Sequence, residues 1–132
     1  MALTILIDTA FQKPSFKKDD MLIFEHEVYY WVMYPEIEAM KKTTGRYIDL
    51  YGSMRMQVQE FVHLRKLIAD VRTRIQPNPA TWEQFIARQL RPVEKDLYEP
   101  VSKNAFSSFL DRFDALIDKA EHQGNALLFD GD

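Results

Sequence analysis

The sequence predicts an all-α protein, a roughly four-helix antiparallel bundle, in a single helical domain over residues 1–132. Apolar residues recur at heptad spacing through residues 46–76, which is typical of one long helix with a buried seam. Residues 103–123 have an uninterrupted apolar face at helical spacing. The chain has only four glycines and six prolines, and this scarcity disfavours the many turns of an all-β protein.

The N-terminal third is predicted to hold a short apolar arm at residues 3–7 and a helix over residues 20–43. Pro35 should kink that helix, because proline removes a backbone amide and clashes with the preceding turn. Residues 22–33 also include a run of Val, Tyr and Trp, which favour strands. The alternative prediction is therefore an α+β fold in which residues 3–7 and 22–33 pair as a small N-terminal hairpin.

The helix predicted over residues 46–76 is the centre of the bundle. Its seam consists of two lines of residues seven apart: Tyr47, Met54, Phe61, Ile68 and Ile75, and Leu50, Gln57, Leu64 and Val71. Gln57 interrupts the seam, and Gly52 weakens the start of the helix. We therefore expect a central bundle helix that is best buried from Phe61 to Ile75, rather than a coiled coil along the whole segment.

Two more helices are predicted, over residues 82–98 and 103–123. Thr81 followed three residues later by Gln84 matches a capping box at the start of the first. Apolar residues continue at helical spacing through Pro92, so we expect a kink there rather than an end. Short connections favour antiparallel neighbours throughout the bundle.

Charge is spread unevenly along the chain, whose net charge is −3. Residues 45–79 carry six basic and three acidic side chains, whereas residues 80–132 carry six basic and ten acidic ones. A basic middle and an acidic end are expected to pair inside the fold. The same distribution disfavours nucleic acid as a partner, because the acidic regions would repel phosphate.

Composition also excludes several classes of chemistry. The chain contains no cysteine, which excludes disulfides, thiolate metal sites and cysteine nucleophiles and suits a reducing compartment. No apolar run approaches the ~18–20 residues that a bilayer requires, and no signal peptide is apparent, so we expect a cytoplasmic protein without a membrane partner. The sequence has no Gly-x-Ser-x-Gly elbow, which a serine nucleophile of that type requires. It also has no glycine-rich phosphate loop, and we expect no cofactor.

An acidic stripe marks the segment 103–123. Its four carboxylates step by three, four and three residues, which places them on one line beside the apolar face: Asp111, Asp114, Asp118 and Glu121. One interpretation is a docking surface for a protein partner with a basic surface, since charge complementarity steers association. The other is that the stripe pairs internally with Arg65 and Arg72, which flank the seam of the predicted central helix.

Aromatic residues cluster at Tyr29, Tyr30 and Tyr34, around Trp31. Because neighbouring aromatics cannot all face one core, we expect some of these tyrosines to be exposed at a partner-binding surface. The alternative is core packing with the phenol groups reaching water.

Glu60 and His63 are three residues apart, so on a helix both side chains can reach one metal ion. A di-iron helical bundle needs two such pairs and two further glutamates, and the sequence offers only one pair. A salt-bridged or solvated pair is therefore the stronger interpretation, and no metal site is favoured.

These observations predict a small acidic, non-enzymatic protein-interaction domain. It would bind one protein partner in the manner of an inhibitor, immunity protein or antitoxin, through the acidic stripe and the tyrosines. One alternative is a metal-dependent helical-bundle enzyme that uses Glu60 and His63. The other is a helical homodimeric adaptor in which part of the long seam is shared between two chains.

Overall fold

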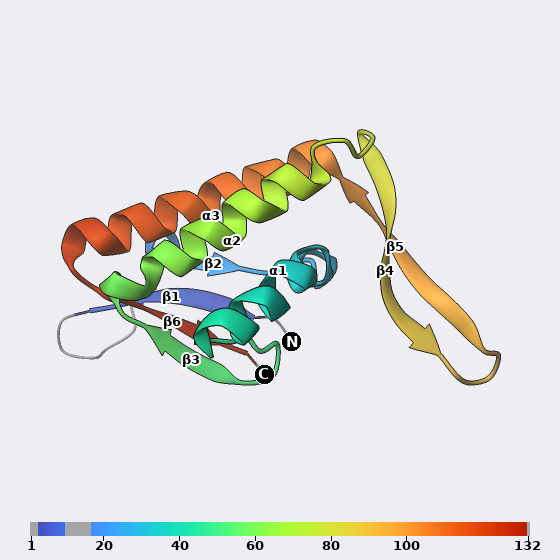
Figure 1. Cartoon of the computed structure of the whole chain (residues 1–132), viewed down its shortest axis with the longest axis horizontal. Coiled ribbons are helices and arrows are strands. Elements are labelled where there is room, and N and C mark those ends of the chain that lie inside the picture. Colours follow the sequence, from blue (N-terminus) through green and yellow to red (C-terminus); the bar gives the residue numbers. More distant parts are fainter. Residues whose placement is uncertain (1–2, 10–16, 132) are drawn as a thin grey trace.

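A computed structural model of the chain describes residues 3–9 and 17–131. Strands and helices alternate along this part of the chain, with short 3-10 turns at Lys18–Asp20 and Val58–Glu60 (Figure 1). In chain order the elements are β1 (Thr4–Asp8), β2 (Met21–Ile23), α1 (Val28–Thr44), β3 (Ser53–Met56), α2 (Phe61–Ile75), β4 (Thr81–Gln89), β5 (Lys95–Ser102), α3 (Lys103–Gln123) and β6 (Ala126–Asp130).

The all-α prediction is wrong, because the described residues contain two antiparallel sheets as well as three α-helices, and the fold is α+β. The long helix predicted over residues 46–76 begins only at Phe61, since Ser53–Met56 pairs as a strand with β6. The helix predicted over residues 82–98 is instead the hairpin of β4 and β5. Apolar spacing misled the prediction in both segments, because each strand is short and a short apolar run fits a helix and a strand equally well.

The alternative prediction named the right class and part of the right pairing. Thr4 of β1 lies opposite Ile23 of β2, and Leu6 lies opposite Met21, in antiparallel register. This pairing stops at Ile23, and helix α1 starts at Val28, within the range 22–33 that the alternative predicted as a strand. The helix predicted from residue 20 therefore starts eight residues later.

The main sheet has four strands in the order β2-β1-β6-β3, all antiparallel to their neighbours. The first and last strands of the chain lie side by side at its centre, with Ile5 opposite Phe129. Helices α2 and α3 lie together across one face of this sheet (Figure 1). Ile5, Ile7, Leu127 and Phe129 point into the core under these helices.

The helices of this layer were predicted best. Helix α3 covers residues 103–123 as predicted, with the Ser102 side chain accepting a hydrogen bond from the Ala105 amide at its start. Gly124 ends it in the left-handed conformation, with φ of 71°, where glycine avoids the strain that a Cβ causes. The predicted burial from Phe61 to Ile75 is also confirmed, since the seam residues of α2 lie in the core.

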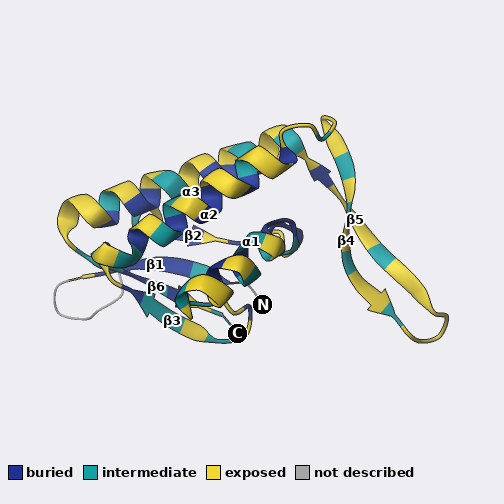
Figure 2. Ribbon diagram, viewed as in Figure 1, coloured by how far each residue is buried: buried dark blue, intermediate teal, exposed yellow. Residues whose placement is uncertain are grey.

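The hairpin of β4 and β5 projects away from the rest of the molecule (Figures 1 and 2). Half-buried and exposed residues alternate along the first part of β4, a period of two that identifies a strand. Val101 is buried and Trp82, directly opposite it, packs against the core, so these residues anchor the base. Pro92 lies in the connection between the strands and kinks no helix.

Within residues 3–9 and 17–131, no helix combines the length and the apolar character that crossing a membrane requires.

We expect the central strand β6 to separate core from surface at adjacent residues. Phe129 is 1% exposed and faces the helices, whereas Leu128 is partly exposed on the opposite face of the sheet. Phe129→Ala should lower the free energy of unfolding by about 3–5 kcal/mol, because it leaves a cavity in the core. Leu128→Ala should cost about 1 kcal/mol. Chemical denaturation measures both values, and equal losses would contradict the described register.

Candidate functional site

The acidic stripe of α3 faces helix α2 and pairs with its arginines. Arg65 Nη2 lies 2.7 Å from Asp118 Oδ1 and 3.2 Å from Glu121 Oε1. Arg72 Nη2 lies 2.8 Å from Asp111 Oδ1 and 3.0 Å from Asp114 Oδ2. Each carboxylate of the stripe therefore has a partner within the fold. This is the internal pairing that the sequence offered as one interpretation, and a partner-binding role for these four residues stays a prediction.

Arg72 also has a perturbed pKa. Partial burial acts to lower the pKa of its guanidinium, but hydrogen bonds and charge from Asp114 and Asp111 outweigh burial and raise it above its ordinary value. The guanidinium is therefore held in its charged form between the two helices.

The three predicted tyrosines lie mainly inside the fold. Tyr29 is buried, and its ring packs edge-on against Phe106 with centroids 5.1 Å apart. Tyr30 is 1% exposed and donates a hydrogen bond of 2.6 Å to the Ile48 carbonyl. Tyr34 is half-buried beside Tyr30, with the rings 5.7 Å apart. Two of the three are thus core residues that attach α1 to its neighbours, and only Tyr34 keeps a partly exposed surface.

Glu60 and His63 are engaged separately. Glu60 accepts a hydrogen bond of 3.0 Å from the Gln57 amide and pairs with Arg46 at 2.8 Å, so it caps the turn before α2. His63 lines a shallow hollow between α1 and α2, together with Lys66 and Asp70. In the part of the chain that the structure describes, no group of three or more His, Asp or Glu side chains is placed to hold a metal ion.

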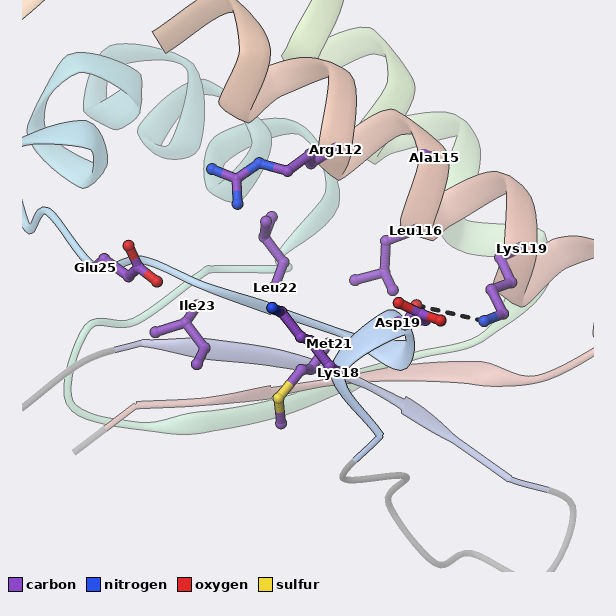
Figure 3. A pocket seen from close by; sticks show the side chains of 10 residues that line it. All are labelled: Lys18, Asp19, Met21, Leu22, Ile23, Glu25, Arg112, Ala115, Leu116 and Lys119. Carbon is purple, nitrogen blue, oxygen red and sulfur yellow. Dashed lines mark hydrogen bonds between the residues drawn. The ribbon is translucent and has the colours of Figure 1, made fainter. Parts of the chain in front are cut away.

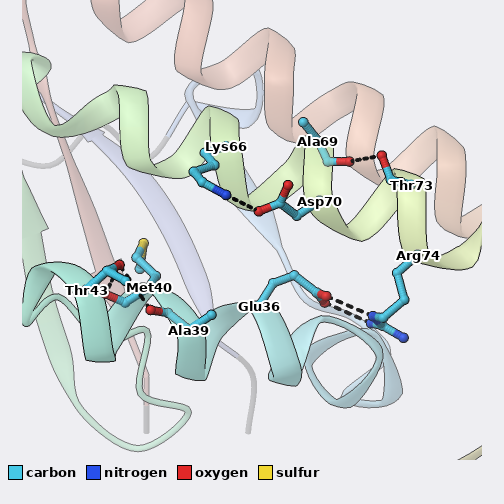
Figure 4. A network of polar contacts seen from close by, with 9 residues as sticks. All are labelled: Glu36, Ala39, Met40, Thr43, Lys66, Ala69, Asp70, Thr73 and Arg74. Carbon is cyan, nitrogen blue, oxygen red and sulfur yellow. Dashed lines mark hydrogen bonds and ion pairs between the residues drawn. The ribbon is translucent and has the colours of Figure 1, made fainter.

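Around this hollow, polar contacts join α1 to α2 (Figure 4). Both carboxylate oxygens of Glu36 lie 2.8 Å from the guanidinium of Arg74, a two-point contact. Lys66 pairs with Asp70 along α2 at 2.6 Å. The contact between Glu36 and Arg74 holds the two helices together. The hollow has little room for a ligand, at about 80 Å³.

The projecting hairpin, which we call the β4–β5 arm (residues 81–102), consists mostly of exposed residues (Figure 2). Several of these exposed residues are large and apolar. Phe85 is 46% exposed and Tyr98, directly opposite, is 53% exposed, with the two rings 5.8 Å apart. Towards the tip, Leu90 and Val93 are 70% and 64% exposed. The sequence interpretation placed Phe85, Leu90 and Val93 on the apolar face of the helix predicted over residues 82–98. Two consecutive polar residues, Glu83 and Gln84, separate Trp82 from Phe85, so no strict alternation indicated a strand.

Ion pairs brace the tip of the arm. Arg88 of β4 pairs with Asp96 of β5 at 2.9 Å and also with Glu94. Arg88 and Asp96 lie directly opposite each other in the register of the two strands, and their ion pair holds the strands together beyond the base. The arm is therefore internally ordered although most of its surface contacts no other part of the described chain.

A groove runs between β2 and one side of α3 (Figure 3). It encloses about 550 Å³, with Met21 and Ile23 on the strand side and Arg112, Ala115 and Leu116 on the helix side. An adjoining hollow of about 340 Å³ shares Arg112 and Ile23 and extends along α3 to Ser108. The sequence analysis did not single out these residues, because only the fold brings β2 beside α3.

Comparison with protein-family models, with curated proteins and with solved structures found no match to this chain.

We expect the Arg72–Asp114 pair to contribute modestly to stability and to weaken with salt. Both side chains are more than a third exposed, and such pairs typically contribute about 0.2–1 kcal/mol. A double-mutant cycle of Arg72→Met and Asp114→Asn, followed by chemical denaturation, should give a coupling in that range that shrinks towards zero in about 1 M salt. The pair of Lys66 and Asp70 is a control within one helix, and its coupling should be no larger. A coupling insensitive to salt would contradict this.

Tyr30 should make the protein less stable at alkaline pH. Burial raises the pKa of its hydroxyl well above the ordinary value, and the hydrogen bond with Tyr47 and the charges of Tyr47, Tyr34 and Asp49 raise it further. The folded chain therefore keeps this proton where the unfolded chain loses it, and the free energy of unfolding should fall as pH rises above about 10.

Tyr30→Phe provides the comparison. At neutral pH it should cost about 1 kcal/mol through the lost hydrogen bond to Ile48. Above pH ~10 its stability should fall less steeply than that of the parent chain. Guanidinium denaturation at pH 7, 9 and ~11 measures both effects, and parallel pH profiles for the two proteins would refute the assignment.

Proposed function

We propose that this chain is a small acidic, non-enzymatic protein-interaction domain that binds one protein partner through the β4–β5 arm. The observation that carries the proposal is the exposure of Phe85, Tyr98, Leu90 and Val93 on a hairpin that extends from the rest of the molecule. The proposal moves the contact surface to the arm, because the acidic stripe already has partners in α2 and the tyrosines are mainly buried.

A free arm of this kind is an unfavourable structure without a partner. A hairpin of two strands is marginally stable in water, and this one packs on the core through one face alone, with Trp82, Ile86 and Val101. Contiguous exposed apolar side chains on soluble proteins commonly mark interaction surfaces. The rings of Phe85 and Tyr98 are also the residue types that are enriched at the centres of interfaces.

The exposed apolar side chains lie on one face and at the tip of the arm, which indicates what kind of surface receives it. Phe85 and Tyr98 lie on the exposed face, and Leu90 and Val93 lie at the tip, whereas Trp82, Ile86 and Val101 pack on the core. A flat surface covers one face of a hairpin but not its tip, whereas a cleft covers both. We therefore infer a partner with an apolar cleft, which is the way an inhibitor occupies a groove on its target.

Charge favours a different protein over a second copy of this chain. The net charge is −3, and residues 81–102 carry four acidic and three basic side chains. Two identical acidic chains repel each other weakly, whereas a partner with basic side chains around its cleft is attracted. The absence of cysteine is compatible with a cytoplasmic location for this chain.

The test measures the contribution of the arm to binding of one purified partner. The chain captures candidates from cells of its source organism, and the captured protein is then purified and titrated by calorimetry. Phe85→Ser with Tyr98→Ser should weaken binding at least tenfold, because hot-spot aromatics each contribute about 2 kcal/mol or more. Tyr51→Ser is the matched control, since Tyr51 is 71% exposed and lies outside the arm. Its affinity should stay unchanged.

Two results would contradict the proposal. One is equal affinity of the arm variant and the parent chain. The other is a dimer of the parent chain in light scattering that dissociates in the arm variant, which would make a second copy the occupant.

A further inference from the structure

The groove between β2 and α3 lies apart from the arm. Among the described residues, it combines a strand edge without a neighbouring strand and a cation, Arg112, without an ion pair. β2 is the outermost strand of the main sheet, with β1 on one side and no strand of the described chain on the other. The side of α3 forms the opposite wall of the groove (Figure 3). An exposed edge of this kind is a template on which another chain can add a strand.

The register shows which backbone groups of β2 are free. The Phe24 amide donates a hydrogen bond of 2.9 Å to the Leu3 carbonyl, so Phe24 faces β1. In an antiparallel pair, alternate residues direct both N–H and C=O to the same neighbour. Leu22 therefore also faces β1, whereas Met21 and Ile23 direct their backbone groups outward, where both residues line the groove.

Arg112 provides the charge on the helix side. Its side chain extends from α3 above the groove (Figure 3), with its guanidinium 5.8 Å from the ring of Phe109. In the described part of the chain Arg112 has no ion pair, unlike Arg65 and Arg72 on the neighbouring helix. Lys119, at the other end of the groove, is already paired with Asp20 at 2.6 Å. Lys18, the third cation of the groove, lies directly beside Asp19. Arg112 is thus the groove cation best placed to meet a carboxylate.

We propose that this groove binds an extended peptide segment of another protein, which adds as a strand to the outer edge of β2 and places one Asp or Glu side chain on Arg112. The three residues of β2 span roughly 10 Å, which matches three peptide residues at about 3.3 Å each. Leu116 and Ala115 of α3 and Ile23 of the strand contact the apolar side chains of that segment.

The remaining charges of the groove limit the peptide to a single acidic residue. Lys18, Asp19 and Glu25 also line the groove, all on the strand side. Lys18 and Asp19 are neighbours in the chain and offset each other, whereas Glu25 repels a second carboxylate placed near the Ile23 end of β2. The site therefore selects one acidic residue flanked by apolar or β-branched residues, rather than an acidic tract.

The test uses a display library of random eight-residue peptides, selected on the full-length chain. Selected sequences should share one Asp or Glu beside β-branched residues, and labelled copies should bind in fluorescence anisotropy. Arg112→Glu should weaken binding at least tenfold, and Arg112→Lys should weaken it less, because Lys keeps the charge but not the two-point contact. Lys42→Glu is the matched control, because Lys42 is an exposed cation of α1 outside the groove, and it should have no effect.

Ile23→Pro tests the strand edge itself. Proline removes the outward amide of Ile23, and an edge strand tolerates it where the N–H faces solvent. Binding should be lost while circular dichroism and the unfolding midpoint stay close to those of the parent. The arm variant Phe85→Ser with Tyr98→Ser should bind the peptide normally, which separates this site from the function proposed above. The inference is overturned if no peptide is selected, if selected peptides lack an acidic residue, or if Arg112→Glu binds as tightly as the parent.

Discussion

Pairing between β1 and β6 is the constraint on which the rest of this structure depends. It joins the two ends of the described chain at the centre of the main sheet, with Thr4 opposite Asp130 and Asp8 opposite Ala126. On the face away from the helices, Arg55 of β3 reaches the buried Asp8 at 2.6 Å, so the pair spans β6. Without β6, both β1 and β3 would lose a neighbour, and the apolar faces of α2 and α3 would have no sheet to cover.

Ion pairs at the exposed surface and apolar packing beneath them hold the three helices together. Arg65 and Arg72 connect α2 to α3, and Arg74 connects α2 to Glu36 of α1. Each pair alone contributes little at a wet surface, but together they determine which helix lies beside which and at what register. This arrangement uses the carboxylates of the stripe within the fold. The β4–β5 arm, with its exposed apolar side chains, and the groove at β2, with its open strand edge, are the surfaces on which we base the two binding proposals.

Both candidate surfaces have the same physical origin: within the described residues, each contains strands that pair with only one other strand. The arm has two strands and contacts the core through one face alone, so Phe85 and Tyr98 remain in water. Among the described residues β2 has one neighbouring strand, and no hydrogen bond is formed there by the outward backbone groups of Met21 and Ile23. An edge strand and an apolar hairpin are both stabilised by adding another chain, and this is the physical basis of the two binding proposals.

The sequence by itself determined the elements whose signals are local. The apolar face, cap and terminal glycine of α3 all lie within or beside 103–123, and the seam of α2 from Phe61 to Ile75 is likewise contained in one helix. The pairing of Arg65 and Arg72 with the acidic stripe was also among the interpretations that the charge pattern suggested. Only the tertiary structure decided the strands, because a strand is defined by a partner far away in sequence. Ser53–Met56 and Ala126–Asp130 become strands because they meet. Residues 81–89 and 95–102 become strands because they pair with each other, and only one face of this hairpin reaches the core.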